Sequence, residues 1–367
     1  MPRKTLVISG IYPPESGGPG KFAQEFSGWL SSLGADSKVL CYSNLESIEE
    51  AGFEVNVVNR KNSFVLRIIR FIHLIYRSSK ANVDVIAVGA FIEVYLATIF
   101  SRTSYVAKVP GDIVWERARN TGYTNLDIED FQSAKLSMKY KFFRYIFALS
   151  LRRARNVIVP SIGLRNLCIK WGVDPIKLRV IYNSVDTNFF VPGNFKNQSF
   201  DITTACRLTT WKKVDELIAL AAKMGLRLGV AGDGPEKVNL QLLARELDAN
   251  VVFFGDLTRE ELLRLFHDSR FFVLNSEYEG LPHVLVEARS SGVLSLARSG
   301  TGSSEVIHDR YDGYMYSNLD GLFQAISYLV SNPKTLQPMK DLARQDALLR
   351  FNKDHNFVQI LEVIRES

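Results

Sequence analysis

The sequence predicts an α/β protein of two Rossmann-like, doubly wound domains that face a central cleft. Length is the first observation, because 367 residues are enough for two hydrophobic cores. The second is an alternation of short apolar, β-rich runs with helical patterns along the whole chain. Near-continuous apolar strands separated by helices are typical of parallel sheets covered on both faces. Ligands of such sheets bind at the carboxyl ends of the strands, so a site is expected there.

The domain boundary is predicted from a break in this alternation. The first series of strands and helices ends near Asn183, and the second begins at Phe200. The stretch PGNFKNQS between them has no periodicity and is rich in turn-forming residues, as a linker is. We therefore expect an N-terminal domain over 1–191, a linker over 192–199, a C-terminal domain over 200–350, and a C-terminal helix over 351–367 that can return to the N-terminal domain.

The composition indicates an ordinary globular protein. Hydrophobic residues make up 46% of the chain and charged residues 23%, and the first residues do not resemble a secretory signal. The longest apolar stretch, 83–100, contains Asp84, Glu93 and a central glycine. We interpret this stretch as strand, turn and helix, and expect no segment to span a membrane.

The three cysteines, Cys41, Cys168 and Cys206, are far apart and form no CxxC pair. A disulfide framework or a zinc site is therefore not expected, and small buried side chains in a reducing cytosol fit the pattern best.

The positive charge is concentrated in the first half. Residues 1–190 contain 25 Lys and Arg against 16 Asp and Glu, which suggests an anionic partner: nucleic acid, anionic lipid or a phosphorylated substrate. Two basic, aromatic, helical stretches, 67–80 and 135–155, can lie at an anionic membrane surface. The alternative is that both are helices packed on the core, with solvated basic faces.

The most informative segment is NSEYEGLPHVLVEARSSG, residues 275–292. It closes a strand, turns through Gly280, Leu281 and Pro282, and opens a helix. Glu279 precedes this helix and Glu287 lies about two turns inside it. Both can border a ligand whose phosphate sits at the helix N-terminus, and a carboxylate can grip the vicinal hydroxyls of a sugar. The alternative is that both glutamates are solvated surface charges.

Two further segments follow strands of the second series. Arg207 and Lys212 lie at a strand-to-helix turn, where two cations can neutralise a diphosphate, whereas Lys213 is expected at the surface. Gly232 and Gly234 lie in VAGDGPE, residues 230–236, where glycine lets a nucleotide approach the backbone. Many ordinary turns share that pattern.

In their order and spacing these three segments resemble the large retaining glycosyltransferase family often numbered 4, which includes sucrose synthases and phosphatidylinositol mannosyltransferases and has the GT-B fold. The resemblance covers essentially the whole chain, and the two glutamates with seven residues between them are its most specific element. It implies that Glu287 holds the ribose of the donor, Glu279 contacts the transferred sugar, and Arg207 and Lys212 bind the diphosphate. It also implies that backbone amides after Gly280 and Leu281 face the sugar and phosphates. His283, in the same turn, is expected to line the donor site.

The N-terminal half carries YPPESGGPGKF, residues 12–22. A P-loop is excluded, because Glu15 and Phe22 occupy positions that the Walker pattern reserves for other residues. The resemblance implies that Gly17 and Gly18 form a loop that approaches the donor phosphate and the acceptor. A simple glycine-proline connection is the alternative.

The chain departs from the family pattern at KVPGDIVWE, residues 108–116, where many relatives have a histidine near the transferred sugar. Asp112 is the best candidate for a polar, catalytic group here, and Trp115 could stack on a sugar ring. Asp112 as a helix N-cap is an equally good interpretation.

These observations predict an enzyme that moves a hexose-type sugar from a nucleotide-diphosphate sugar to a hydroxyl of a glycan or lipid-linked acceptor, with retention of configuration. We expect no cofactor and no metal, because no DxD or HExxH pattern is present. The expected location is the cytoplasm, with peripheral contact at the inner face of the membrane as a further hypothesis. An epimerase or phosphorylase of the same fold is the alternative enzyme. A basic-faced nucleic-acid or membrane-binding protein is the non-enzyme alternative, although aromatic RNA-binding signatures are absent.

Overall fold

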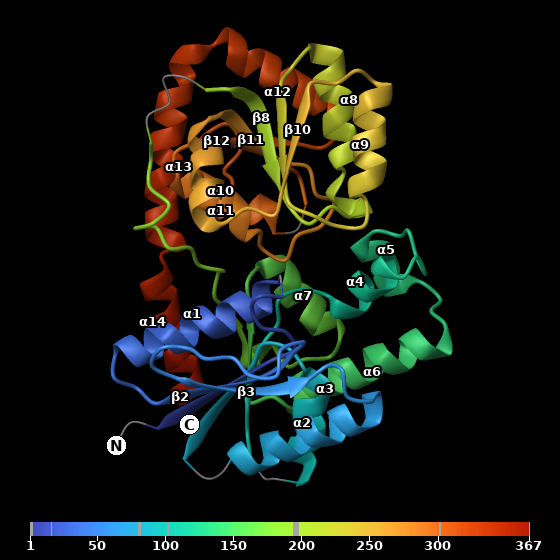
Figure 1. Cartoon of the computed structure of the whole chain (residues 1–367), viewed down its shortest axis with the longest axis vertical. Coiled ribbons are helices and arrows are strands. Elements are labelled where there is room, and N and C mark those ends of the chain that lie inside the picture. The colour runs from blue at the N-terminus through green and yellow to red at the C-terminus, as the bar shows by residue number, and fades with distance from the viewer. Residues whose placement is uncertain are drawn as a thin grey trace. The chain divides into compact units, whose positions relative to one another are not determined.

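The computed structural model describes residues 3–15, 17–79, 82–100, 103–193, 198–300 and 302–366. Of the expected linker, residues 194–197 lie outside this part of the chain. The chain divides into two compact units (Figure 1). Unit 1 combines Met1–Ala118, Ala134–Ile181 and Phe357–Ser367, and unit 2 combines Arg119–Ser133 and Tyr182–Asn356.

Unit 1 contains, within the described residues, a seven-stranded sheet in the order β3-β2-β1-β4-β5-β6-β7. All its strand pairs are parallel. The strand order reverses direction between β1 and β4, and the carboxyl ends of two such strands form the usual binding edge of an open sheet. The strands are β1 Lys4–Ser9, β2 Ser37–Ser43, β3 Glu54–Asn59, β4 Val83–Ala87, β5 Val106–Lys108, β6 Asn156–Val159 and β7 Leu178–Val180.

Unit 2 contains a six-stranded parallel sheet in the order β10-β9-β8-β11-β12-β13, again counted over the described residues. Here the order reverses between β8 and β11, so the loops after these two strands lie at the binding edge. The strands are β8 Phe200–Ala205, β9 Leu228–Ala231, β10 Val251–Gly255, β11 Ser269–Leu274, β12 Leu294–Arg298 and β13 Tyr314–Tyr316. The expected α/β class, with two Rossmann-like parallel sheets, is confirmed.

Helices enclose the sheet of unit 1, and the last helix of the chain is one of them. Phe357, Ile360 and Ile364 of this helix are buried in one cluster with Phe26 and Leu30, and the ring of Phe357 contacts that of Phe26 edge-on, with centroids 5.3 Å apart. The helices whose residues lie wholly or mainly in unit 1 are α1 Gly18–Ser32, α2 Phe64–Ser78, α3 Phe91–Phe100, α4 Ile113–Asn120, α6 Met138–Arg153, α7 Ile162–Lys170, η1 Pro175–Lys177 and α14 Lys353–Arg365.

Two hydrophobic clusters fill the space between the sheet of unit 2 and its helices. Local sequence fixes some helix starts: Thr258 and Glu261 form a reciprocal capping box at the first turn of α10, which satisfies two backbone donors. The helices are α5 Ile128–Ser133, η2 Thr210–Lys212, α8 Val214–Met224, α9 Lys237–Glu246, α10 Arg259–His267, α11 His283–Ser290, η3 Ser303–Glu305, α12 Leu319–Ser331, η4 Pro333–Thr335 and α13 Leu336–Arg350.

The sequence predicted that the three cysteines are small buried side chains and that no segment spans a membrane. Cys41 and Cys168 are buried and Cys206 is partly buried, and all three are free thiols. No helix among the described residues is both long enough and apolar enough to cross a membrane.

Candidate functional site

The turn after β8 carries the two predicted phosphate-binding cations. Arg207 is exposed, and the backbone around it is fixed from both sides: Cys206 N–H donates to Ala231 O at 3.1 Å and Leu208 N–H donates to Asp233 O at 2.9 Å. Lys212 ends the short helix η2. This turn therefore holds two cations at the carboxyl end of β8, which is the binding edge of the sheet.

The loop after β11 reaches this turn through ion pairs. Lys212 Nζ lies 2.5 Å from Glu279 Oε1, and the two side chains are only 15% and 14% exposed. Lys213 Nζ lies 3.2 Å from Glu277 Oε1, and Glu277 N–H donates to Trp211 O at 2.9 Å. Residues that the sequence singled out separately are thus brought together. Glu277 and Lys213 were not predicted as site residues, and Lys213 is partly rather than fully exposed.

The glycines of the loop after β9 have a packing role. Gly232 has a φ of +112°, and a Cβ there would lie 2.0 Å from the carbonyl oxygen of Cys206. A Cβ on Gly234 would lie 2.3 Å from the carbonyl oxygen of Leu208. Both glycines therefore let this loop pack directly on the cation-bearing turn. Their contact with a nucleotide stays a prediction.

The turn through Gly280 leads into α11 with a backbone suited to an anion. Leu281 is buried in the core, and its carbonyl oxygen accepts a hydrogen bond from Asn183 Nδ2 at 3.0 Å. Pro282 precedes the first helical residue, His283, and provides no side-chain cap. The first N–H groups of α11 thus have no cap from that position, and such a helix start favours a negative ligand group.

Glu287 lies in α11 and is 5% exposed. Because Glu279 is also largely buried in its ion pair, the alternative that both glutamates are solvated surface charges is wrong. A carboxylate held inside a protein needs polar partners, and at the binding edge of a sheet a ligand can supply some of them.

In unit 1 the structure favours the N-cap interpretation of Asp112. Its Oδ1 accepts hydrogen bonds from the N–H groups of Val114 and Trp115, each at 3.0 Å, and the residue is 1% exposed. Trp115 is 0% exposed. The suggestion that its ring stacks on a sugar is wrong, because the ring is enclosed by the core. A direct catalytic role for Asp112 stays a prediction.

The glycine loop of unit 1 leads into α1. Gly18 is the first residue of α1, and Gly17, at its N-cap position, makes no side-chain cap. A Cβ on Gly18 would meet no described atom within 4 Å, whereas one on Gly17 would lie 2.2 Å from Ile11 Cδ1. The loop therefore has open space at Gly18 and close packing at Gly17.

Sequence reasoning missed a buried cation in unit 1. Lys108, at the carboxyl end of β5, is 6% exposed, and its Nζ lies 4.8 Å from the centre of the Phe22 ring. Burial lowers the pKa of Lys108 to about 8. The signal available in the sequence was a lysine inside the apolar run YVAKVP.

A buried ion network holds the far end of α11. Arg289, 0% exposed, contacts Asp312 at 2.9 Å and Asp346 at 3.0 Å, and Arg350 also contacts Asp346, at 2.6 Å. His308 Nδ1 lies 2.7 Å from Asp312 Oδ2. Burial alone would raise the pKa of Asp312, but the hydrogen bonds and charge of Arg289 hold it below its usual value.

His308, Asp312 and Asp346 bring three possible metal-ligand atoms within 4.8 Å of one another. The two carboxylates already face two guanidinium groups, so the charges of the network balance without an ion. A cation bound here would have to displace Arg289 from Asp312. The cluster is better described as structural support for α11.

Most predicted donor residues lie in unit 2, in the loops that follow β8, β9 and β11 and in the first turns of α11. Gly17 and Gly18 of the predicted phosphate and acceptor loop, and the candidate polar group Asp112, lie in unit 1. The donor set in unit 2 comprises Arg207, Lys212, Gly232, Gly234, Glu279, Gly280, Leu281, Pro282, His283 and Glu287.

Comparison with known families gives two matches that divide the chain between them. Residues 16–189 match the model of "Glycosyltransferase Family 4", and residues 185–346 match "Glycosyl transferases group 1". The chain is 23% identical to the amylovoran biosynthesis glycosyltransferase AmsD of Erwinia amylovora over 86% of both chains. It is also 23% identical to a GDP-mannose-dependent phosphatidylinositol monomannoside mannosyltransferase of Corynebacterium glutamicum, over 83% of this chain and 82% of the relative.

Solved structures show the same fold over the full length. Anabaena HepE, determined with UDP and glucose, superimposes with a TM-score of 0.77 at 17% identity, and covers 99% of both chains. A sucrose-phosphate synthase from Thermosynechococcus elongatus gives a TM-score of 0.82 at 15% identity, over 99% of this chain and 98% of that one.

Proposed function

The chain belongs to the GT-B glycosyltransferases of the group 1 and family 4 type, and from this premise we propose that it transfers a hexose-type sugar, with retention, from a nucleotide-diphosphate sugar to a hydroxyl of a glycan or lipid-linked acceptor. The observation that carries the proposal is the Lys212–Glu279 pair beside the start of α11. A cation for the leaving group and a carboxylate for the sugar lie in direct contact there.

The donor binds to unit 2 in this account. The buried carboxylate of Glu287 accepts hydrogen bonds from the ribose hydroxyls. The diphosphate lies between Arg207, Lys212 and the first N–H groups of α11, where charge-assisted hydrogen bonds are strong. Its entry separates Lys212 from Glu279, which frees the carboxylate to accept from hydroxyls of the transferred sugar. Gly280, Leu281 and His283 border the sugar and phosphates.

The chemical step breaks the bond between the anomeric carbon and the diphosphate oxygen. Negative charge develops on the leaving group, and the two cations and the helix dipole stabilise it. The acceptor hydroxyl attacks from the face that the leaving group vacates, and a donor phosphate oxygen takes its proton. Configuration is then retained without a covalent enzyme intermediate, and no metal is required, because protein groups balance the charge. We assign Gly17, Gly18 and Asp112 to the acceptor side.

The acceptor class follows from the relatives. One relative, from Escherichia coli, is named as a galactosyltransferase that uses UDP-Gal and a diphosphoundecaprenol-linked acceptor, and the Corynebacterium glutamicum relative acts on a phosphatidylinositol mannoside. By analogy we propose a lipid-linked or polysaccharide acceptor for this chain, in the assembly of a surface glycan.

Two helices of unit 1 support contact with an anionic membrane at the cytoplasmic face. Each buries one side, with Phe71 and Ile75 in α2 and Phe147 and Leu151 in α6. The alternative interpretation, in which both helices pack on the core, is therefore correct for the buried side of each helix. Large apolar side chains remain exposed on the rest, at 51–79% of their surface: Phe64, Val65, Leu66, Ile69 and Tyr76 in α2, and Met138, Phe142 and Tyr145 in α6.

Basic residues accompany these apolar side chains, including Arg70 and Arg77 in α2 and Lys139 and Lys141 in α6, all of them exposed. Exposed aromatic and aliphatic groups beside lysine and arginine suit the interface of an anionic bilayer, where the apolar groups enter the headgroup region. Helix α3 packs against both helices, so the three form one layer of unit 1.

Donor hydrolysis against a panel of UDP-, GDP- and ADP-sugars tests the proposed function. We expect slow release of the matching nucleoside diphosphate, and thermal stabilisation of the protein by that nucleotide. An epimerase would convert the donor sugar without releasing nucleotide, and a phosphorylase would require free phosphate. A binding protein for nucleic acid would respond to none of these donors.

A further inference from the structure

A cavity of about 880 Å³ lies in unit 2 along the edge strand β13, between that strand, α12 and the start of α13. Its volume is in the range of small-molecule sites. Tyr316, Ala325 and Met339 line it with side chains that are 3–7% exposed. None of the residues assigned to the donor site lines this cavity.

Two tyrosines give the cavity an aromatic wall. The ring centroids of Tyr314 and Tyr328 are 6.1 Å apart, with the ring planes tilted by 43°, and Tyr328 is 48% exposed. A tyrosine ring presents an apolar face and carries a hydroxyl that can donate or accept. That combination suits a pyranose, which has a face of C–H groups and an edge of hydroxyls.

The polar rim suits a ligand that is rich in hydroxyls. Asp309 Oδ1 accepts the N–H of Met315 at 2.8 Å, and its Oδ2 lies 3.7 Å from Arg310 Nε. Lys334, which is exposed, lines the same cavity, so two cations and one carboxylate border it. Hydroxyls can use all three groups, since the carboxylate accepts and the two cations donate. Gln324, exposed on α12, adds an amide to the same cavity.

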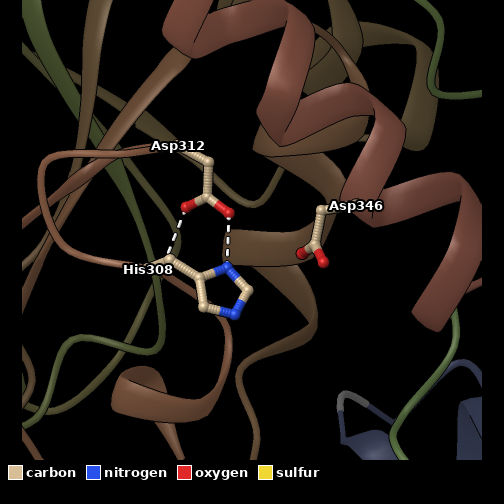
Figure 2. Close-up of side chains that lie close together, drawn as sticks. All are labelled: His308, Asp312 and Asp346. Carbon is tan, nitrogen blue, oxygen red and sulfur yellow. Dashed lines mark hydrogen bonds and ion pairs between the residues drawn. The ribbon is translucent and has the colours of Figure 1, made fainter.

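A backbone hydrogen bond and a buried ion pair fix the turn that carries Asp309 and Arg310. Arg310 adopts a left-handed φ of 59°, and its N–H donates to Gly313 O at 2.8 Å. Asp312 in the same turn is fixed by Arg289 and His308, and Figure 2 shows how His308 and Asp312 face each other at this turn. A non-glycine residue persists in this conformation when its surroundings impose it. Asp309 and Arg310 are therefore presented from a fixed backbone.

We propose that this cavity is a second carbohydrate site, which binds a pyranose residue of a glycan. The inference rests on the proposed function, since an enzyme that extends glycans would bind its acceptor chain at a second site in this way. Ser299 lines the cavity and directly precedes Gly300, where a Cβ would lie 3.3 Å from the carbonyl oxygen of Glu277. The cavity thus adjoins the loop that carries Glu277 and Glu279.

Saturation-transfer NMR on the full chain tests this site, with maltotriose, cellotriose, chitotriose and xylotriose as probes. We expect at least one trisaccharide to bind, and its binding to persist when a nucleoside diphosphate saturates the donor site. Tyr328→Ala should weaken this binding about tenfold, the size of one lost aromatic contact, and Gln324→Ala, an exposed position, should weaken it too.

Tyr311→Ala is the matched control, because Tyr311 is 60% exposed on the same turn but does not line the cavity. It should leave trisaccharide binding unchanged. Failure of all four probes to bind, or equal binding by wild type, Tyr328→Ala and Gln324→Ala, would overturn the proposal. Nucleotide binding by the wild type is measured separately, so the result for this cavity does not affect the test of the proposed donor site.

Discussion

Lys212 and Glu279 form an ion pair of 2.5 Å between the turn after β8 and the loop after β11, and both side chains are about 85% enclosed by protein. Two enclosed, opposite charges at the binding edge of a sheet neutralise each other, and in the proposed mechanism the donor separates them. A diphosphate attracts the lysine and sugar hydroxyls attract the glutamate, so one nucleotide sugar can replace both halves of the pair.

The two glutamates that we propose as donor ligands should differ in effect. Glu287→Ala should weaken binding of the nucleoside diphosphate, because losing a charge-assisted hydrogen bond costs roughly 1.5–3 kcal/mol. Glu279→Gln should lower kcat more than nucleotide affinity, because its proposed contact is with the transferred sugar. Calorimetry and donor hydrolysis measure the two effects, with exposed Glu246→Gln as control. Similar behaviour of both variants would show that the division of roles is wrong.

Activity should survive chelation. Arg207, Lys212 and the start of α11 are proposed to balance the charge of the diphosphate, so EDTA should leave the rate of donor hydrolysis unchanged. The measurement compares the rate before and after chelation and after adding Mg²⁺ or Mn²⁺. Complete loss with EDTA, restored by either ion, would contradict metal independence.

The protein should bind anionic vesicles through unit 1. Flotation with phosphatidylglycerol-containing vesicles at low salt should carry the protein, and salt should weaken the binding, since the screening length falls to about 8 Å at physiological ionic strength. Replacing Leu66 and Ile69 by Ser should reduce flotation. Replacing the equally exposed Val238 and Leu349 of unit 2 should not. Equal flotation on neutral vesicles, or none on anionic ones, would favour a soluble acceptor.

Lys108 should make stability depend on pH. Its pKa is lowered to about 8 from the ordinary 10.5, so between these values the unfolded chain binds the proton and the folded chain does not. The contribution of Lys108 to stability is thus least favourable below pH 8 and improves as the pH rises towards 10.5.

Relative to the wild type, the free energy of unfolding of Lys108→Met should accordingly be higher at pH 7 than at pH 9.5, by roughly 2 kcal/mol. Urea unfolding of both proteins at the two pH values measures this difference. A difference between variant and wild type that does not change with pH would contradict the lowered pKa of Lys108.

Sequence reasoning predicted the sheets and the strand-to-helix loops of unit 2 because these features are local. Strand, turn and helix follow one another around Glu279 and Arg207, and the apolar runs show which strands are buried on both faces. The sequence could not predict that Lys212 and Glu279 touch, since they are 67 residues apart and meet only because β8 and β11 are neighbours in the sheet.

Other failures have the same physical origin. Trp115 was interpreted as a ring that could stack on a sugar, and only the packed structure shows that this ring is buried. Nothing in the local sequence marks Arg289, two residues after Glu287, as a buried charge. Its burial depends on Asp312 and Asp346, which come from distant segments. Long-range partners decide the state of a charged side chain, and no local pattern records them.

A double-mutant cycle on Arg207 and Lys212 tests the central claim most directly. Steady-state donor hydrolysis is measured for wild type, Arg207→Ala, Lys212→Ala and the double variant, with folding checked by circular dichroism. Each single change should cost roughly 2.7–4 kcal/mol in barrier height, or about 100- to 1000-fold in rate, as the loss of one charge stabiliser does. The double variant should lose less than the sum, because both groups act on one diphosphate. Near-normal rates in both single variants would contradict the assignment of this turn to the leaving group.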